Sequence, residues 1–325
     1  MDYRRLGHSG LKVSALALGS WITFGGALDR GGARRLVAHA YDAGISLFDS
    51  AENYAGGLAE EWLGDVIADL RLPRDAICLS SKAFFGAAPD PRPTQRGLSR
   101  KHLRDACDAA LARLRTDYLD LFFCHRPDPE TPVEETVAAM DLLVRTGKVL
   151  YWGTSEWPAE LIRSALRCAR ANGLTPPTAE QAQYNLLHRK RVEFEYAPLY
   201  DDPGLGLTTW SPLASGLLSG KYAQGRMPEG SRRARRDHGW HDDVLPGASE
   251  AARDAAVARL ADLADALDAT PAALAIAWCL RNPKVSSVIL GCSSTAQLDA
   301  NLAALALAQR LDPGTLARLD ALADD

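Results

Sequence analysis

Residues 45–70, "ISLFDSAENYAGGLAEEWLGDVIADL", contain the unit whose repetition decides the fold. A short apolar run ends at Asp49, a polar turn follows, and the segment from Gly57 to Leu70 places apolar residues at helical spacing. The same order of an apolar run and an amphipathic segment recurs along the chain. We therefore expect alternating strands and helices.

Eight runs are strand candidates, and their apolarity is continuous, as is typical of a parallel sheet covered on both faces. They lie at 13–19, 45–50, 76–84, 117–125, 149–156, 178–185, 205–213 and 285–293. Eight strand–helix units predict an α/β protein with a (β/α)8 TIM barrel, as a single domain over residues 1–325 with long loops at the C-terminal face. An open doubly wound sheet is the alternative, but no G-x-G-x-x-G turn follows the first strand.

Several helix ends carry their own signals. Ser99 is placed to cap the helix that follows it, and Gly147 and Gly173 stand where two later helices should end.

Composition limits the classes of partner. The chain has 37 basic and 41 acidic residues among 325, so its net charge of −4 does not attract nucleic acid or an anionic membrane. No apolar stretch reaches membrane-spanning length, and the N-terminus does not resemble a signal peptide. The six cysteines are scattered without metal-ligand spacing, which favours a reducing compartment. We expect a cytoplasmic protein that binds no metal and no nucleic acid and does not insert into a membrane.

Four groups with acid–base chemistry stand at the ends of adjacent predicted strands. Asp49 ends the second, Tyr54 follows it, Lys82 ends the third and His125 ends the fourth. Each alone has a structural explanation, as a helix cap, a rim aromatic, a cation reaching to solvent or a core histidine. The active site of a TIM barrel lies at this edge, and a buried Asp and Lys are costly unless they pair. The four together therefore favour a catalytic site.

The residue types suggest a reaction. A phenol has a pKa of about 10, which a neighbouring ammonium lowers, and a carboxylate can hold that ammonium charged. A histidine beside the phenol can polarise a substrate oxygen. The set suits protonation of a carbonyl oxygen while a hydride arrives at carbon. Glu52 and Glu60 receive no role, because Glu60 begins a helix and Glu52 has no identifiable partner.

Residues 221–246 are polar and rich in Arg and Gly, and such long loops are uncommon unless functional. Within them, "RRARR" at 232–236 reads as a solvated loop, because no aromatic platform or basic face elsewhere supports nucleic-acid binding.

Nine sequence blocks, in order over nearly the whole chain, resemble the aldo-keto reductase family and most closely its voltage-gated potassium-channel β-subunit branch. They include "GISLFDSAENY" (44–54), "HRPDPETPVEETVAAM" (125–140), "TTWSPLASGLLSGKY" (208–222) and "SSVILGCSSTAQLDAN" (286–301). The resemblance implies Tyr54 as general acid, Lys82 as the group lowering its pKa, Asp49 as the charge partner of Lys82, and His125 as the substrate-orienting group. Channel β-subunits carry asparagine at the position of His125, so this histidine favours a working reductase.

The resemblance also implies NADPH, bound in extended form across the barrel mouth without a Rossmann fold. The cofactor-binding residues it implies are Gly19, Ser20, Trp21, Asp49, Ser155, Gln183, Trp210, Ser211, Pro212, Leu213, Ser215, Gly216, Leu217, Lys221, Arg232, Gly291, Ser293, Gln297 and Asn301. Lys221 and Arg232 would serve the phosphates, and a loop at about 217–247 would clamp the cofactor. The family glutamate before Asn301 is Ala300 here, so one adenine contact is missing.

The implied substrate is a small aldehyde or ketone, apolar or aromatic, in a pocket lined by Trp21, Tyr54, Phe84, Phe85, His125 and Trp157. One alternative is a cofactor-loaded regulatory subunit of a membrane channel with slow redox activity. Another is a Schiff-base aldolase with Lys82 as nucleophile. Channel β-subunits form tetramers, so the resemblance also allows a homo-oligomer.

Overall fold

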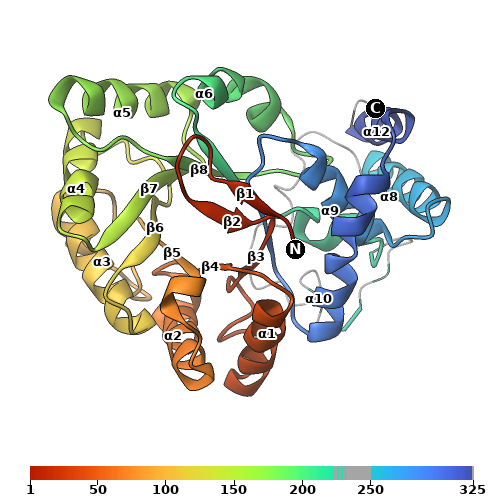
Figure 1. Ribbon diagram of the computed structural model, residues 1–325, viewed down its shortest axis with the longest axis horizontal. Coiled ribbons are helices and arrows are strands. Elements are labelled where there is room, and N and C mark those ends of the chain that lie inside the picture. Colours follow the sequence, from red (N-terminus) through yellow and green to blue (C-terminus); the bar gives the residue numbers. More distant parts are fainter. Residues whose placement is uncertain (223–225, 227, 230, 232–249, 324–325) are drawn as a thin grey trace.

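The eight predicted strands close into one parallel barrel in a computed structural model, which describes residues 1–222, 226, 228–229, 231 and 250–323 (Figure 1). Around the barrel the order is β10, β3, β4, β5, β6, β7, β8 and β9. The bounds are β3 Leu16–Gly19, β4 Leu47–Asp49, β5 Cys78–Ala83, β6 Leu119–Cys124, β7 Val149–Ser155, β8 Ala179–Gln183, β9 Gly206–Trp210 and β10 Ser287–Leu290. The predicted TIM barrel is confirmed.

Helices surround the barrel and cover its outer face (Figure 1). They are α1 Arg30–Asp42, α2 Leu58–Leu70, α3 Arg100–Leu114, α4 Val133–Arg145, α5 Ala159–Asn172, α6 Ala197–Asp201, α8 Glu250–Asp265, α9 Pro271–Arg281, α10 Thr295–Leu302, α11 Ala304–Arg310 and α12 Pro313–Asp320. The Ser99 hydroxyl accepts from the backbone N–H of His102, which confirms the predicted cap of α3. Gly173 ends α5 in a left-handed conformation, and Gly147 follows α4 with φ of 75°.

An antiparallel hairpin of β1 (Tyr3–Arg5) and β2 (Lys12–Ser14), which we did not predict, lies across one end of the barrel (Figure 1). Its Leu6 and Val13 are fully buried in a cluster that includes Leu47, Leu121 and Phe123 from the barrel strands. Because the cluster joins the hairpin to the inner face of the strands, the hairpin closes the amino-terminal end of the barrel.

The inward rows of the strands change character along their length. Leu47 on β4 is followed two residues later by Asp49, and Phe123 on β6 by His125. Side chains two apart on a strand share a face. The amino ends of the strands therefore fill the barrel with apolar groups, and the carboxyl ends present polar groups.

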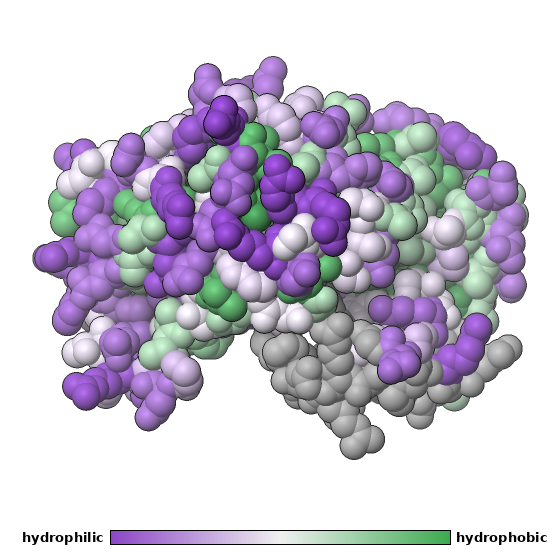
Figure 2. Space-filling view, turned by 90° about the horizontal axis from the view of Figure 1, so that it is seen from below, coloured by the Kyte–Doolittle hydropathy of each residue, from purple (hydrophilic) through white to green (hydrophobic). Residues whose placement is uncertain are grey.

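Figure 2 shows one side of the molecule, where hydrophilic residues are widespread and hydrophobic ones occupy separate smaller areas. Within the described part of the chain, every helix is too short or too polar to cross a membrane.

Candidate active site

The ends of β4 and β5 bring Asp49 and Lys82 into contact inside the barrel. Lys82 Nζ lies 2.7 Å from Asp49 Oδ2 and also donates to the backbone oxygen of Ser50 at 2.6 Å. Burial is the largest single influence and opposes protonation of Lys82, but Asp49 and Tyr54 together outweigh it and raise the pKa of the ammonium. Lys82 is therefore held as a cation.

Two further groups hold the Asp49 carboxylate. The Ser80 hydroxyl donates to Oδ1 at 2.6 Å, and the Gln181 amide donates to the same oxygen at 3.1 Å. We did not predict either residue. The strand period would have identified both, since Ser80 is two residues before Lys82 and Gln181 two before Gln183.

Tyr54 begins the short helix η1 (Tyr54–Gly57), directly after the turn that leaves β4. Its hydroxyl lies 3.4 Å from Lys82 Nζ, and the side chain is 9% exposed. Burial raises the pKa of Tyr54, and the nearby Lys82 charge opposes this increase without reversing it. The residue types predict the correct sign for the effect of Lys82 but not the larger effect of burial. Tyr54 thus remains a protonated donor at neutral pH.

His125 follows β6 and faces Tyr54. The two rings meet edge to face with centroids 5.9 Å apart. Burial, together with the charges of Lys82 and Arg126, lowers the pKa of His125 well below its ordinary 6.5, so the imidazole is neutral. Its buried Nδ1 has no hydrogen-bond partner among the described residues. A neutral ring beside the phenol can donate a hydrogen bond to a substrate oxygen.

Aromatic side chains surround these groups. Trp21 lies 6.4 Å from Tyr54, Phe85 lies 5.1 Å from His125, and Phe84 packs edge to face on Phe85, all measured between ring centroids. Phe85 is 37% exposed. Trp21 and Phe85, both predicted to line the pocket, therefore lie beside Tyr54 and His125, and Phe84 extends this aromatic group through Phe85.

Trp157 is 1% exposed and belongs to the main hydrophobic core. It follows the carboxyl end of β7, and its indole Nε1 is buried without a hydrogen-bond partner among the described residues. Its place in the substrate pocket stays a prediction.

Ser155, Gln183 and Trp210, three of the predicted cofactor-binding residues, end the consecutive strands β7, β8 and β9. Glu156, which we did not predict, joins them: its Oε1 accepts from the backbone N–H of Gln183 at 2.6 Å and from the Trp210 indole at 3.0 Å. Its Oε2 accepts from Arg191 at 2.6 Å. Arg126, also not predicted, donates to the backbone oxygen of His125 and reaches the Ser155 hydroxyl at 3.4 Å.

Gly19 and Ser20 are also predicted cofactor-binding residues. Gly19 is the last residue of β3, which lies between β10 and β4 in the barrel, and Ser20 begins the loop that follows. The Ser20 N–H donates to the backbone oxygen of Asp49 at 2.9 Å. This contact ties the loop that carries Trp21 to the end of β4.

The segment after β9 has an unusual backbone. Ser211, Ala214, Ser215 and Gly216 have φ between 47° and 94°, in the left-handed region. Strained backbone of this kind clusters at ligand sites. A Cβ on Gly216 would lie 2.9 Å from Lys221 Nζ, so the Lys221 side chain folds over this segment. The predicted residues Pro212, Leu213 and Leu217 belong to the same stretch, whereas Arg232 and most of the predicted clamp lie outside the described residues.

Four of the predicted cofactor-binding residues lie between the end of β10 and the end of α10. Gly291 is exposed just beyond β10, and the Ser293 N–H and hydroxyl both donate to Gln297 Oε1. Asn301 is 7% exposed, and its amide lies 3.3 Å from Cys292 Sγ. Asn301 therefore has a structural contact in addition to its predicted role.

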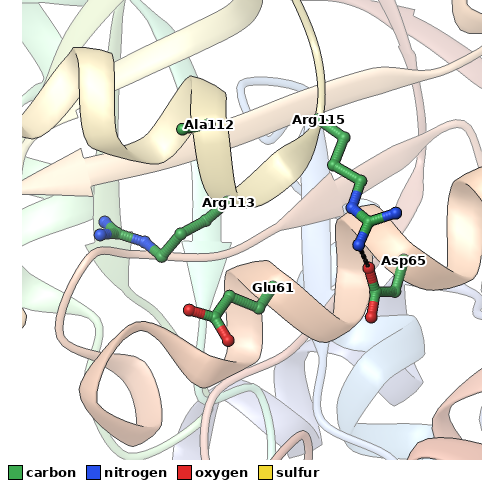
Figure 3. Close-up of a pocket in the computed structure, with 5 residues that line it drawn as sticks. All are labelled: Glu61, Asp65, Ala112, Arg113 and Arg115. Carbon is green, nitrogen blue, oxygen red and sulfur yellow. Dashed lines mark ion pairs between the residues drawn. The ribbon is translucent and has the colours of Figure 1, made fainter.

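A separate cavity of about 330 Å³ lies between α2 and α3, lined by Glu61, Asp65, Ala112, Arg113 and Arg115 (Figure 3). Three of its lining residues are in ion pairs: Arg115 lies 2.5 Å from Asp65, and Arg113 lies 2.7 Å from Glu60. None of its lining residues belongs to the predicted site. Within the described part of the chain, no group of three or more His, Cys, Asp or Glu side chains is arranged to hold a metal ion.

Comparison with known proteins agrees with this geometry. The model of the Aldo/keto reductase family matches residues 15–324. The chain belongs to the aldo/keto reductase family. A probable voltage-gated potassium channel subunit beta from Arabidopsis thaliana is 44% identical over 326 residues, covering 98% of this chain and 96% of the relative. A protein with the same description from Oryza sativa subsp. japonica is 44% identical over 328 residues, covering 99% and 96%. This aldo/keto reductase is therefore an oxidoreductase, similar along its length to proteins described as channel β-subunits.

Proposed function

We propose that this aldo/keto reductase reduces aldehydes and ketones to alcohols with NADPH. The observation that carries the proposal is the position of Lys82 Nζ, which lies 2.7 Å from Asp49 and 3.4 Å from the Tyr54 hydroxyl. A cation held between a carboxylate and a phenol stabilises the phenolate that forms when the phenol gives up its proton.

Each of the four residues has a separate task. Tyr54 donates its proton to the carbonyl oxygen, Lys82 stabilises the resulting phenolate, and Asp49 keeps Lys82 charged and oriented. His125, neutral and edge-on to Tyr54, orients the carbonyl oxygen. NADPH, when bound, supplies the hydride that adds to the carbonyl carbon.

The residues near the mouth suit NADPH. Trp210 offers an aromatic face whose indole N–H is fixed by Glu156, and Ser155 and Gln183 end the two preceding strands. Lys221 lies over the left-handed segment at Gly216 and provides a cation for a phosphate. A cation at the 2′-phosphate is the feature that favours NADPH over NADH, so this preference depends on Lys221 and on Arg232, which lies outside the described residues.

The Schiff-base alternative is disfavoured by the state of Lys82. An amine must be neutral to attack a carbonyl, whereas the Lys82 ammonium is fully buried against a carboxylate that raises its pKa. Borohydride trapping with a carbonyl substrate should therefore give no adduct.

The experiment that tests the proposal is a panel of aldehydes and ketones offered with NADPH and NADH side by side. We expect oxidation of NADPH with apolar or aromatic carbonyls, and a loss of 10²–10⁴-fold in kcat for Tyr54→Phe with cofactor binding retained. Inertness toward the whole panel, or equal rates in wild type and Tyr54→Phe, would reject the proposal.

A second candidate function comes from the relatives, which are described as probable voltage-gated potassium channel subunits. In this role the chain would hold NADPH and dock on a membrane channel as a cytoplasmic, homo-oligomeric subunit with slow redox activity. His125 argues for turnover instead, since by the family resemblance channel subunits carry asparagine there. Co-purification with a membrane channel, together with negligible turnover, would favour this second function.

A further inference from the structure

Glu52 is a buried carboxylate in the turn between β4 and η1, and the chemistry proposed above does not use it. It lies three residues after Asp49 and two before Tyr54, and it is 3% exposed. A buried carboxylate is costly unless hydrogen bonds satisfy it. The hydrogen bonds that Glu52 accepts therefore indicate which parts of the chain it holds together.

One oxygen of Glu52 receives donors from two other parts of the chain. Oε1 accepts from the backbone N–H groups of Phe84 at 2.7 Å and Gly86 at 2.8 Å. His102, on the first turn of α3, is 4% exposed, and its Nε2 lies 3.2 Å from the same oxygen. Three donors on one carboxylate oxygen form a clamp between the turn that precedes Tyr54 and the loop that follows β5.

The clamped loop has a conformation that depends on glycine. Gly86 has φ of +79°, and a Cβ there would lie 2.4 Å from the backbone oxygen of Gln95. The loop is thus a tight turn whose N–H groups at positions 84 and 86 both converge on Glu52. The Glu52 backbone N–H in turn donates to the Lys82 oxygen at 3.1 Å, just before the loop begins.

The same loop carries the aromatic side chains beside the acid–base site. Phe85 packs on His125 with ring centroids 5.1 Å apart, and Phe84 packs on Phe85 at 5.0 Å. His125 in turn faces Tyr54 at 5.9 Å. Glu52 therefore joins the backbone next to the proton donor to the apolar wall on the other side of His125.

We propose that Glu52 is a positioning residue, held by His102, that sets the distance between Tyr54 and the Phe84–Phe85 wall and so selects apolar or aromatic carbonyl substrates. This inference rests on the proposed reductase function for its substrate class. Neither Glu52 nor His102 takes part in proton transfer. They act through the loop.

The test compares Glu52→Ala, Glu52→Gln and a matched control, Asp141→Ala. Asp141 is also a buried carboxylate, 4% exposed, that accepts from a backbone N–H, that of Thr175 at 2.8 Å, but it lies on α4 and contacts the loop before β8. Glutamine keeps a carbonyl oxygen that can accept from the two loop N–H groups, so Glu52→Gln should rescue much of what Glu52→Ala loses.

Two readouts are needed. Hydrogen exchange of the backbone amides at 84–86 should quicken on the order of tenfold or more in Glu52→Ala, and should stay at the wild-type rate in Asp141→Ala. The KM for an aromatic aldehyde should rise on the order of tenfold in Glu52→Ala, with a smaller change for a small aliphatic aldehyde and an unchanged Kd for NADPH. His102→Gln should reproduce part of both effects and add little to Glu52→Ala.

Unchanged exchange at 84–86 in Glu52→Ala would overturn the inference. So would equal effects on KM from Glu52→Ala and Asp141→Ala, because that result would reduce Glu52 to a general stability role. If wild type turns over no carbonyl compound, the proposed function fails, and the exchange readout alone decides whether Glu52 holds the loop.

Discussion

The ammonium nitrogen of Lys82 lies 2.7 Å from Oδ2 of Asp49, and the two side chains are 0% and 5% exposed. Each charge is thus removed from water and is compensated chiefly by the other. We expect this pair to contribute to the stability of the barrel mouth and, second to burial, to influence the pKa of Tyr54.

Replacing one member of this pair should destabilise the fold, and replacing both members should cost less than the two single variants would lead one to expect. Asp49→Asn leaves a buried ammonium without its counter-charge, and we expect the free energy of unfolding to fall by about 3–5 kcal/mol. The double variant Asp49→Asn with Lys82→Met should lose less than the sum of the single variants. Urea denaturation at one fixed pH measures all of them, and strictly additive losses would contradict a coupled pair.

The pH dependence of carbonyl reduction should follow Tyr54. Burial raises the pKa of this phenol and Lys82 opposes the increase, so the donor stays protonated through neutral pH and the rate should fall only on the alkaline side. In Lys82→Met the opposing charge is absent, and the residual activity should begin to fall at a higher pH than in wild type. An alkaline limb at the same pH in both proteins would show that another group controls it.

Stability toward acid should depend on His125. Burial, Lys82 and Arg126 lower the pKa of the folded imidazole below 6.5, the ordinary value that it regains on unfolding. The unfolded chain therefore binds more protons below about pH 6.5, and the free energy of unfolding falls as the pH drops from there toward the folded pKa, by at most about 1.4 kcal/mol per pH unit.

The comparison of wild type with His125→Asn isolates this effect, because His188 also has a lowered pKa and contributes equally to both proteins. We expect the difference in stability between the two to shift in favour of the variant as the pH falls below 6.5. Parallel pH profiles would mean that His125 titrates alike in the folded and unfolded states.

Cofactor affinity should depend on Glu156. Replacing it with alanine removes the acceptor for both the Gln183 N–H and the Trp210 indole, and we expect the Kd for NADPH to rise about tenfold. Glu156→Gln keeps a carbonyl acceptor and should bind more nearly as wild type does. Quenching of tryptophan fluorescence by NADPH measures both. Equal affinities in wild type and Glu156→Ala would show that the contacts of Glu156 with Gln183 and Trp210 do not contribute to cofactor binding.

The barrel could be predicted because its strands are covered on both faces and read as continuous apolar runs. The β1–β2 hairpin could not, since its strands have three residues each and only Leu6 and Val13 reveal its buried side. The meeting of Asp49 and Lys82 followed from one rule, that the carboxyl ends of barrel strands share an edge.

Other features depend on distances that no sequence pattern encodes. Glu52 received no role from the sequence because its partners are the backbone N–H groups of Phe84 and Gly86, and contacts of this kind leave no pattern in the sequence. Trp157 follows a strand as Trp210 ends one, yet only Trp210 is left partly exposed. The direction in which the pKa of Tyr54 shifts depends on whether the effect of burial exceeds the effect of the Lys82 charge. The residue types indicate the charge but not the extent of burial.

Substitutions at the two ends of the inward-facing rows of the barrel have different consequences. Phe123 and His125 are two residues apart on one row, yet a substitution at Phe123 acts on the packed interior, whereas one at His125 acts at the barrel mouth, where we propose that the substrate oxygen binds. A lineage can therefore exchange the residues of the mouth, and with them the reaction or its rate, while the lower layer closed by the hairpin continues to specify the same fold. Loss of catalysis in a descendant would then leave its architecture as a ready scaffold for binding.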